Sequence, residues 1–184
     1  MTSDALPDHG VDDRLTGLVA KDQIRDLAMA YAWAVDDHDI DTVVGMFTED
    51  GIFDVSGEVA AGHDEIRKSF VASMSRFTTM LHTPEIHLIE IKDTEHAVGR
   101  ATGHAELAFR DTLMLTAYRY RDRYVRHDGV WRFAERHVRF MYAVPIESMA
   151  TAFGDTKRIR WPQNRYQHAD YPESASTWNT YRET

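Results

Sequence analysis

Apolar residues recur at helical spacing over residues 18–37, and this spacing predicts a first helix. The inner face of this helix is formed by Ile24, Leu27, Ala28, Tyr31 and Val35. An apolar stripe of this kind is stable only when it is buried against another element. We therefore expect the first helix to pack on the core.

Two further helices are predicted in the first half of the chain. Asp39 or Asp41 is able to cap a short second helix, because a carboxylate accepts hydrogen bonds from the free N–H groups of a first turn. Residues 62–77 predict a third helix. Residues 48–57 predict one short strand between two turns.

The second half of the chain changes to a period of two. Alternation predicts long strands over 82–93, 98–109, 113–126 and 130–145, with a hairpin turn at 127–129. Helices followed by a run of strands specify an α+β domain. The expected architecture is three N-terminal helices packed on a curved, mostly antiparallel sheet that closes into a cone.

The chain is long enough for one domain with extra segments at its ends. Residues 1–15 are expected to be a disordered arm, and residues 16–150 to form the domain. Residues 151–184 show little periodicity but contain several aromatic residues. We expect this tail to pack on the domain or on a neighbouring subunit, where it would close a pocket or cover the neighbour.

Small residues line one face of the strand predicted over 98–109. They are Gly99, Ala101, Gly103 and Ala105. Small side chains on the inner face of a curved sheet leave space for a ligand. They also permit close packing of a helix, and the sequence alone does not choose between the two interpretations.

Composition and charge exclude several classes of function. The formal net charge is −9, which disfavours nucleic-acid binding. The sequence contains no apolar run of 18 residues and no cysteine, so a membrane span and thiolate chemistry are not expected. No address signal is recognisable, and the cytoplasm is the default expectation. The ten histidines show no metal-binding spacing, so no metal is predicted.

Two adjacent aspartates near the end of the first helix differ in their expected surroundings. On a helical wheel Asp36 falls between Ala32 and Trp33, in an apolar sector, whereas Asp37 falls on the polar side. A carboxylate that loses part of its hydration is suited to proton transfer. The alternative is that the helix frays here and Asp36 is solvated.

Tyr31 and His82 are further candidates for chemistry. A buried tyrosine needs a hydrogen-bond partner, which in a pocket is a substrate oxygen and in a core is the backbone. His82 begins a strand and is able to exchange a proton at neutral pH, although a lone strand histidine is also a common structural residue. Strand parity predicts that His87 faces the opposite side from His82.

Arginines alternate with aromatic residues on the last two strands. Strand parity places Arg119, Arg121 and Arg123 on the outer face, as a solvated or subunit-facing stripe or an anion site. Parity also separates Arg136 from the face that carries Phe133. A curved sheet with such an outer face predicts a homo-oligomer, a dimer or a trimer.

Three segments together resemble a known family. They are IRDLAMAYAWAVDDHDIDTVVGMFTEDGIFDV, the MLHTP segment and YRDRYVRHDGVWRFAERHVRFMY. Residues 17–150 resemble the SnoaL-like branch of the nuclear-transport-factor-2 (NTF2-like) and ketosteroid-isomerase fold. Within it, the likeness is to cofactor-free lyases: scytalone dehydratase, bile-acid 7α-dehydratase and hexachlorocyclohexane dehydrochlorinase.

This resemblance implies roles for individual residues. The catalytic Asp–His pair of these lyases matches Asp36 and His82. The tyrosine five residues before the aspartate of the bile-acid enzyme matches Tyr31. The dehydrochlorinase has a lysine there, so dehydration is favoured over loss of HCl. An arginine after its GVWKF-like segment matches Arg136, which we expect to bind substrate.

Two aromatic residues complete the predicted site. Trp33 and Phe53 are expected to contact the substrate. The expected function is a cofactor-independent, dehydratase-like elimination on a small apolar carbonyl compound. The alternatives are an isomerase or polyketide-type cyclase that uses the same dyad, a non-catalytic binding module, or a small oxygenase subunit.

Overall fold

The structure is a computed structural model that describes residues 9–153, 156–160, 165–178 and 180. Its elements, in chain order, are α1 (His9–Asp36), α2 (Ile40–Gly45), β1 (Phe47–Val55), β2 (Glu58–Ala61), α3 (Gly62–Met74), β3 (Phe77–Ile91), β4 (His96–Phe109), β5 (Thr112–His127), β6 (Val130–Pro145), the 3₁₀ turn η1 (Ile146–Ser148), β7 (Lys157–Arg160) and β8 (Arg165–His168). None of the described helices is both long enough and apolar enough to cross a membrane.

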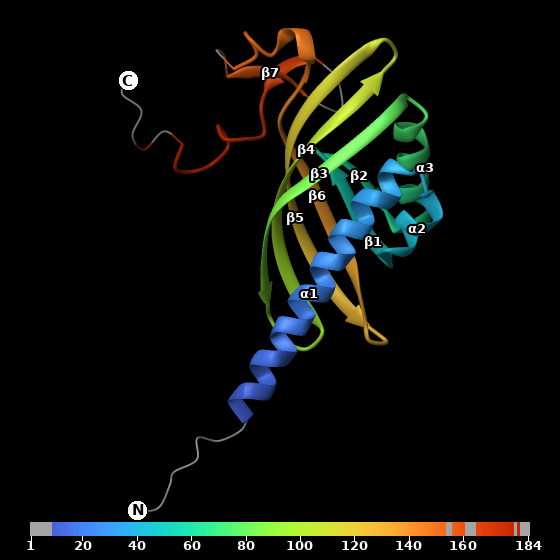
Figure 1. The fold of residues 1–184 in the computed structure, drawn as a ribbon, viewed down its shortest axis with the longest axis vertical. Coiled ribbons are helices and arrows are strands. Elements are labelled where there is room, and N and C mark those ends of the chain that lie inside the picture. The colour runs from blue at the N-terminus through green and yellow to red at the C-terminus, as the bar shows by residue number, and fades with distance from the viewer. Residues whose placement is uncertain (1–8, 154–155, 161–164, 179, 181–184) are drawn as a thin grey trace, which may run out of the picture.

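The described residues form a six-stranded sheet with the order β2-β1-β6-β5-β4-β3. β1 and β6 are parallel, and the other neighbours are antiparallel. Figure 1 shows the long strands bending around α1, with α2 and α3 beside β1 and β2. The predicted α+β architecture with a curved sheet is confirmed.

The inner face of α1 is the predicted one. Ile24, Tyr31 and Val35 are all buried in the core between α1 and the sheet. The helix ends at Asp36, and His38 takes a positive φ in the turn that follows. Asp39 then caps α2, because its carboxylate accepts hydrogen bonds from the backbone N–H and the hydroxyl of Thr42.

The helix begins earlier than the sequence pattern predicts. α1 starts at His9, so residues 9–15 are helical, although a disordered arm was expected there. Residues 1–8 of that arm lie outside the described residues. The apolar stripe starts later than the helix, and exposed residues such as those at 13–15 give no periodic signal.

The short strand predicted within residues 48–57 is the first strand of a hairpin, β1, which pairs with β2. β1 and β2 pair from Ile52 with Ala61 to Val55 with Glu58, across the two-residue turn Ser56–Gly57. Both turn residues have positive φ, as a tight twisted hairpin requires. β2 is too short to show a period, which is why the pattern predicted no second strand after the turn.

The described part of the tail packs on the outer face of the sheet. β7 and β8 pair with each other, and Figure 1 places them on the side of the sheet away from α1. The Asp170 carboxylate accepts hydrogen bonds from the Phe140 backbone N–H and the Ser56 hydroxyl. Arg158 is buried and pairs with Glu173 within the tail.

Candidate active site

Asp36 and His82 meet through two contacts. The distance between His82 Nδ1 and Asp36 Oδ1 is 2.5 Å, and the His82 backbone N–H donates to Asp36 Oδ2 at 2.8 Å. Both side chains are mostly buried, with 13% of His82 and 16% of Asp36 exposed. One Asp36 oxygen accepts from the His82 backbone N–H and the other contacts the His82 ring, so the orientation of the imidazole is fixed.

Two elements far apart in sequence position this pair. Asp36 is the last residue of α1, and His82 lies 46 residues later on β3, along which α1 packs. A carboxylate at Nδ1 favours the tautomer that carries its proton on that nitrogen. Nε2 of His82 is then the unprotonated nitrogen, which is able to accept a proton from a ligand.

A cavity of about 300 Å³ adjoins His82. Apolar side chains from the helices and strands make up just over half of its lining, and the polar lining residues include the charged Glu58 and Arg76. The proposals below use His82, Tyr31 and Thr116. A largely apolar wall with several polar groups is typical of a site for a small organic molecule. Asp36 lies behind His82 and is not among the lining residues.

Tyr31 lies at the cavity wall and is fully buried. Its ring packs edge-to-face against Phe70 and Phe133. Burial raises the pKa of Tyr31 well above its usual value, and the nearby charge of Arg136 only partly opposes this effect. Tyr31 therefore remains a neutral phenol, which donates a hydrogen bond and does not act as a base.

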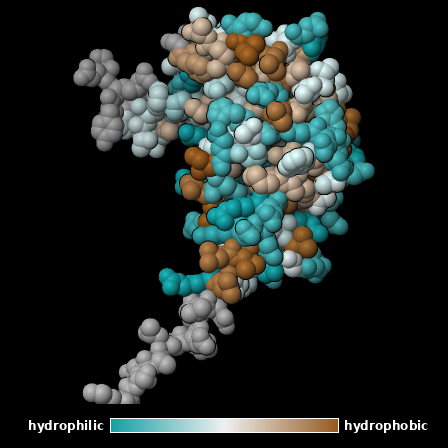
Figure 2. Space-filling model, viewed as in Figure 1, coloured by the Kyte–Doolittle hydropathy of each residue, from teal (hydrophilic) through white to brown (hydrophobic). Residues whose placement is uncertain are grey.

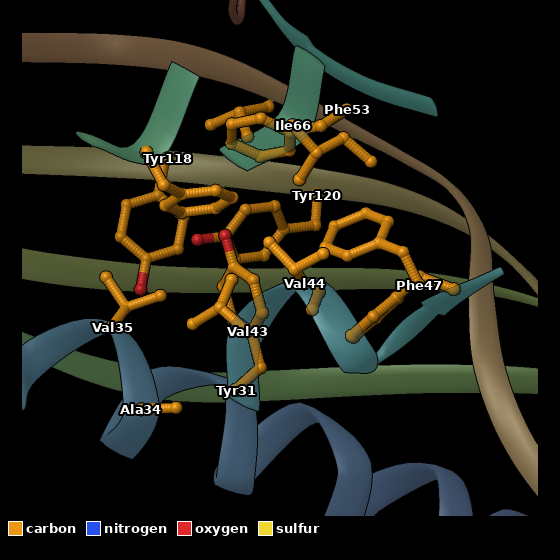
Figure 3. Packing of buried hydrophobic residues seen from close by; sticks show 14 of the residues in the cluster. Tyr31, Ala34, Val35, Val43, Val44, Phe47, Phe53, Ile66, Tyr118 and Tyr120 are labelled. Carbon is orange, nitrogen blue, oxygen red and sulfur yellow. The ribbon is translucent and has the colours of Figure 1, made fainter. Parts of the chain in front are cut away.

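Tyr118 is a second phenol at the cavity, beside His82. Its ring centroid lies 5.9 Å from that of His82. Figure 3 shows its side chain reaching from β5 towards Val35 on α1. Burial is also the main cause that raises the pKa of Tyr118 above its usual value. Tyr118 alternates with Arg119 along the strand, which is consistent with its place on the inner face.

Residues 17–137 match the SnoaL-like domain, and this match covers well over half of the chain. The chain belongs to the SnoaL-like domain family. A search of curated proteins found no match.

Solved structures share the fold of this SnoaL-like domain. A scytalone dehydratase-like protein from Novosphingobium aromaticivorans is 21% identical, with a TM-score of 0.67 over 70% of this chain and 89% of its own. Hexachlorocyclohexane dehydrochlorinase LinA-type3 from Novosphingobium barchaimii is 20% identical, with a TM-score of 0.68 over 74% and 96% of the two chains. A Mycobacterium tuberculosis protein of unknown function is 26% identical, with a TM-score of 0.63 over 79% and 83%.

Arg136 of the SnoaL-like domain occupies a different position from the one expected. It is 1% exposed and makes two hydrogen bonds to the Asp122 carboxylate, at 3.1 and 3.0 Å. Its guanidinium lies 4.2 Å from the centre of the Tyr31 ring and is not among the residues that line the 300 Å³ cavity. Arg136 therefore supports Tyr31 from behind, and direct contact with a ligand in this cavity does not fit its position.

A β-bulge explains the altered orientation of Arg136. Phe133 pairs with Tyr124 while Glu135 pairs with Arg123, so β6 has one extra residue at Ala134. A bulge reverses the alternation beyond it. Arg136 therefore points to the same face as Phe133, whereas strand parity had predicted opposite faces.

A second bulge corrects the prediction for His87. The register of β3 shifts between Pro84 and His87, which turns His87 to the same inner face as His82. There Nε2 of His87 lies 3.0 Å from the Tyr124 hydroxyl. Burial lowers the pKa of His87. It does not line the 300 Å³ cavity and is a structural residue.

The two predicted aromatic contacts have different positions. Phe53 lines the cavity and stacks on Phe70 with the ring centres 4.8 Å apart. Trp33 is 73% exposed on the outer side of α1 and lines neither this cavity nor a smaller one of about 20 Å³, so the predicted substrate contact does not fit. The sector around Asp36 is therefore not a dry apolar sector. Its contacts to His82, rather than its helix neighbours, define its environment.

The small residues on β4 have two different uses. A Cβ at Gly103 would lie 2.5 Å from the Tyr118 hydroxyl oxygen, and one at Gly99 would lie 2.8 Å from the Tyr124 ring. These two positions are therefore filled by tyrosines from β5. Ala105 lines the 300 Å³ cavity, so space for a ligand remains there.

The outer arginine stripe is partly covered by the tail. Tyr171 lies 4.8 Å from the Arg119 guanidinium and 5.6 Å from that of Arg121, measured to its ring centre. Arg123 pairs with Glu135. No described tail residue lines the cavity, so closure of this pocket by the tail does not fit the described residues.

Within the described part of the chain, no group of three or more acidic or histidine side chains is arranged to hold a metal ion.

Proposed function

We propose that this SnoaL-like domain is a cofactor-independent lyase that removes water from a small apolar carbonyl compound. The observation that carries this proposal is the Asp36–His82 pair, held at 2.5 Å beside an apolar cavity of about 300 Å³. Proton abstraction needs a base that is oriented and partly shielded from water, and His82 meets both conditions. The shared fold supports a lyase-type or isomerase-type enzyme.

The elimination follows from the positions of the three residues. His82 Nε2 takes a proton from the carbon next to the carbonyl, and the negative charge of Asp36 stabilises the imidazolium that forms. The neutral phenol of Tyr31 donates to the enolate oxygen. The carbon–oxygen bond on the next carbon then breaks, a carbon–carbon double bond forms, and His82 returns the proton to the departing hydroxide as water.

Isomerisation begins with the same proton transfer, so the product distinguishes the two reactions. Loss of water indicates a lyase, whereas a shifted double bond at constant composition indicates an isomerase. A pure binding module would be favoured by Asp36 and His82 lying far apart, and their separation of 2.5 Å does not support it.

The dehydration of 3-hydroxy-1-tetralone to 1-naphthol tests the proposal. We expect the native protein to accelerate it, and Asp36→Asn and His82→Gln to lose about 10²–10⁴-fold in rate, the usual contribution of a positioned acid or base. Asp37→Asn and His104→Gln are matched controls on exposed side chains and are expected to retain the rate. No acceleration by the native protein, or equal rates in native protein and Asp36→Asn, would contradict the proposal.

We also infer that the chain forms a homo-oligomer. Leu15, Leu18 and Val19 on α1 are exposed, and Figure 2 shows hydrophobic residues gathered beside the first turns of this helix. Such a patch is usually covered by another chain. Light scattering during gel filtration should give a multiple of 21.2 kDa, and a mass of one chain would contradict this inference.

A further inference from the structure

Thr116 is a buried polar residue whose hydroxyl is not satisfied. The residue is 1% exposed, and its Oγ1 has no hydrogen-bond partner among the described residues. A buried hydroxyl without a partner is unfavourable by about 1–3 kcal/mol. Thr116 also lines the 300 Å³ cavity, so a ligand is able to supply the missing partner.

The sheet register places Thr116 in the same row as the proposed base. His82 pairs with Ala105, Ala105 with Thr116, and Thr116 with Ala143. Directly paired residues project on the same side of the sheet. Strands are about 4.8 Å apart, so the Cα atoms of His82 and Thr116 are separated by roughly 10 Å. The residue between them, Ala105, has a methyl side chain that leaves this span open.

Neither neighbour in the row is able to satisfy the hydroxyl. Ala105 and Ala143 carry no polar side-chain atom, and Thr116 donates to no backbone oxygen among the described residues. Rotation by about 120° about the Cα–Cβ bond moves the hydroxyl to another staggered position, so it is able to turn towards a ligand over Ala105.

We propose that Thr116 is a specificity-determining residue that binds a second oxygen of the substrate. The substrate lies across Ala105, with the carbon that loses its proton at His82 and a remote hydroxyl or carbonyl at Thr116. This proposal rests on the proposed function, which places the substrate in this cavity. It narrows the substrate class from apolar ketones to ketones with a second oxygen on the opposite side of the ring system.

Binding of hydroxylated ketones tests the role of Thr116 without any turnover. The probes are 1-tetralone and its 5-, 6- and 7-hydroxy derivatives, with affinities measured by calorimetry. We expect the native protein to bind one hydroxy isomer roughly 3- to 10-fold more tightly than 1-tetralone, the effect of one net hydrogen bond. Thr116→Val should abolish this preference, and Thr116→Ser should keep it.

Two controls separate this proposal from a structural role and from the proposed function. Thr116→Val removes an unsatisfied hydroxyl and should leave Tm unchanged or higher, whereas a clear fall in Tm would show a structural hydrogen bond and overturn the proposal. Asp36→Asn should keep the hydroxyl preference even if it loses all turnover. No preference in the native protein, or an equal preference in Thr116→Val, would also overturn the proposal.

Discussion

At the scale of single residues, burial decides which groups act as acids, bases or donors. His82 is held through Nδ1 and the backbone by one carboxylate, so Asp36 fixes both its tautomer and its orientation. Tyr31 is buried beside the cavity and keeps its proton. Arg136, with its Asp122 partner, supports the tyrosine ring from behind. His82 is therefore suited to accept a proton and Tyr31 to donate a hydrogen bond, while Asp36 and Arg136 hold them in place.

The hydroxyl of Tyr31 provides a prediction at this scale. Tyr31→Phe keeps the packing of the ring but removes the donor to the enolate oxygen. We expect kcat for the dehydration to fall about 10²–10³-fold, the usual effect of losing one such donor, with little change in KM. Steady-state kinetics measure this, with exposed Tyr166→Phe as the control. A Tyr31→Phe variant with native kcat would remove this residue from the mechanism.

At the scale of elements, the sequence located most of the strands, and it failed where the backbone is irregular. Period-two alternation predicted the four long strands, because one face of β4, β5 and β6 is buried and one face of the edge strand β3 is partly buried. The bulges near Glu85 and Ala134 reverse that alternation. Pro84 fits a bulge but fits an edge strand equally well, and no residue type marks the bulge at Ala134. The Asp36–His82 pair was found through resemblance, since a contact between residues 46 apart has no periodic signal.

Alanine substitution at two glycines is expected to have opposite effects on stability, because Tyr118 of β5 fills the space over Gly103 of β4 and nothing fills the space over Gly17. Gly103→Ala places a methyl group 2.5 Å from the Tyr118 hydroxyl oxygen and 2.9 Å from a backbone oxygen of Thr83, so Tyr118 has to move. We expect a loss of about 1–3 kcal/mol in unfolding free energy, the usual cost of overpacking. Gly17→Ala on α1 meets nothing within 4 Å and should stabilise by about 0.5–1 kcal/mol. Urea unfolding compares them, and equal effects of the two substitutions would contradict this packing.

The junction between β1 and β6 predicts a dependence of stability on pH. Burial alone would raise the pKa of Asp54, but hydrogen bonds from Arg139 and His137 lower it to about 2. The stabilisation of the folded state by ionised Asp54 is therefore complete above the ordinary pKa of 3.8. It is lost as the pH falls through about 2. Burial alone would lower the pKa of His137, but hydrogen bonds to Asp54 and Glu135 raise it. The stabilisation of the folded state by protonated His137 is therefore lost only as the pH rises above 6.5.

The comparison of native protein with Asp54→Asn isolates this effect. The native protein should be the more stable of the two at pH 5, and the difference in unfolding free energy should shrink as the pH falls from 4 to 2. Urea unfolding at each pH measures the difference. A difference that stays constant over this interval would show that Asp54 is not held by these contacts.

At the scale of the whole molecule, the cavity and the tail lie on opposite faces of the sheet. The cavity is formed between the helices and the inner face, whereas the described part of the tail contacts Phe140, Ser56 and the outer arginines. We therefore expect the described part of the tail to contribute to stability rather than to closure of the site. Its composition alone did not show which face it covers, because its aromatic residues fit either one.

Truncation of the tail tests this division. Deleting residues 156–184 removes the Asp170 hydrogen bonds to the sheet and uncovers Arg119 and Arg121. We expect Tm to fall, by about 2–4 °C for each kcal/mol of stability that the tail provides. Binding of 1-tetralone should change much less, because no described tail residue lines the cavity. A truncated protein with native Tm and weakened binding would contradict this assignment and restore the tail as a lid.

The proposed function depends on one step, in which His82 removes a proton next to a carbonyl with the support of Asp36. Exchange of the C2 protons of 1-tetralone in D₂O, followed by NMR, measures this step alone, whatever reaction follows it. We expect the native protein and Asp37→Asn to accelerate the exchange, and Asp36→Asn and His82→Gln to reduce the acceleration about 10²–10⁴-fold. Exchange in Asp36→Asn at the native rate would show that Asp36 does not support proton removal.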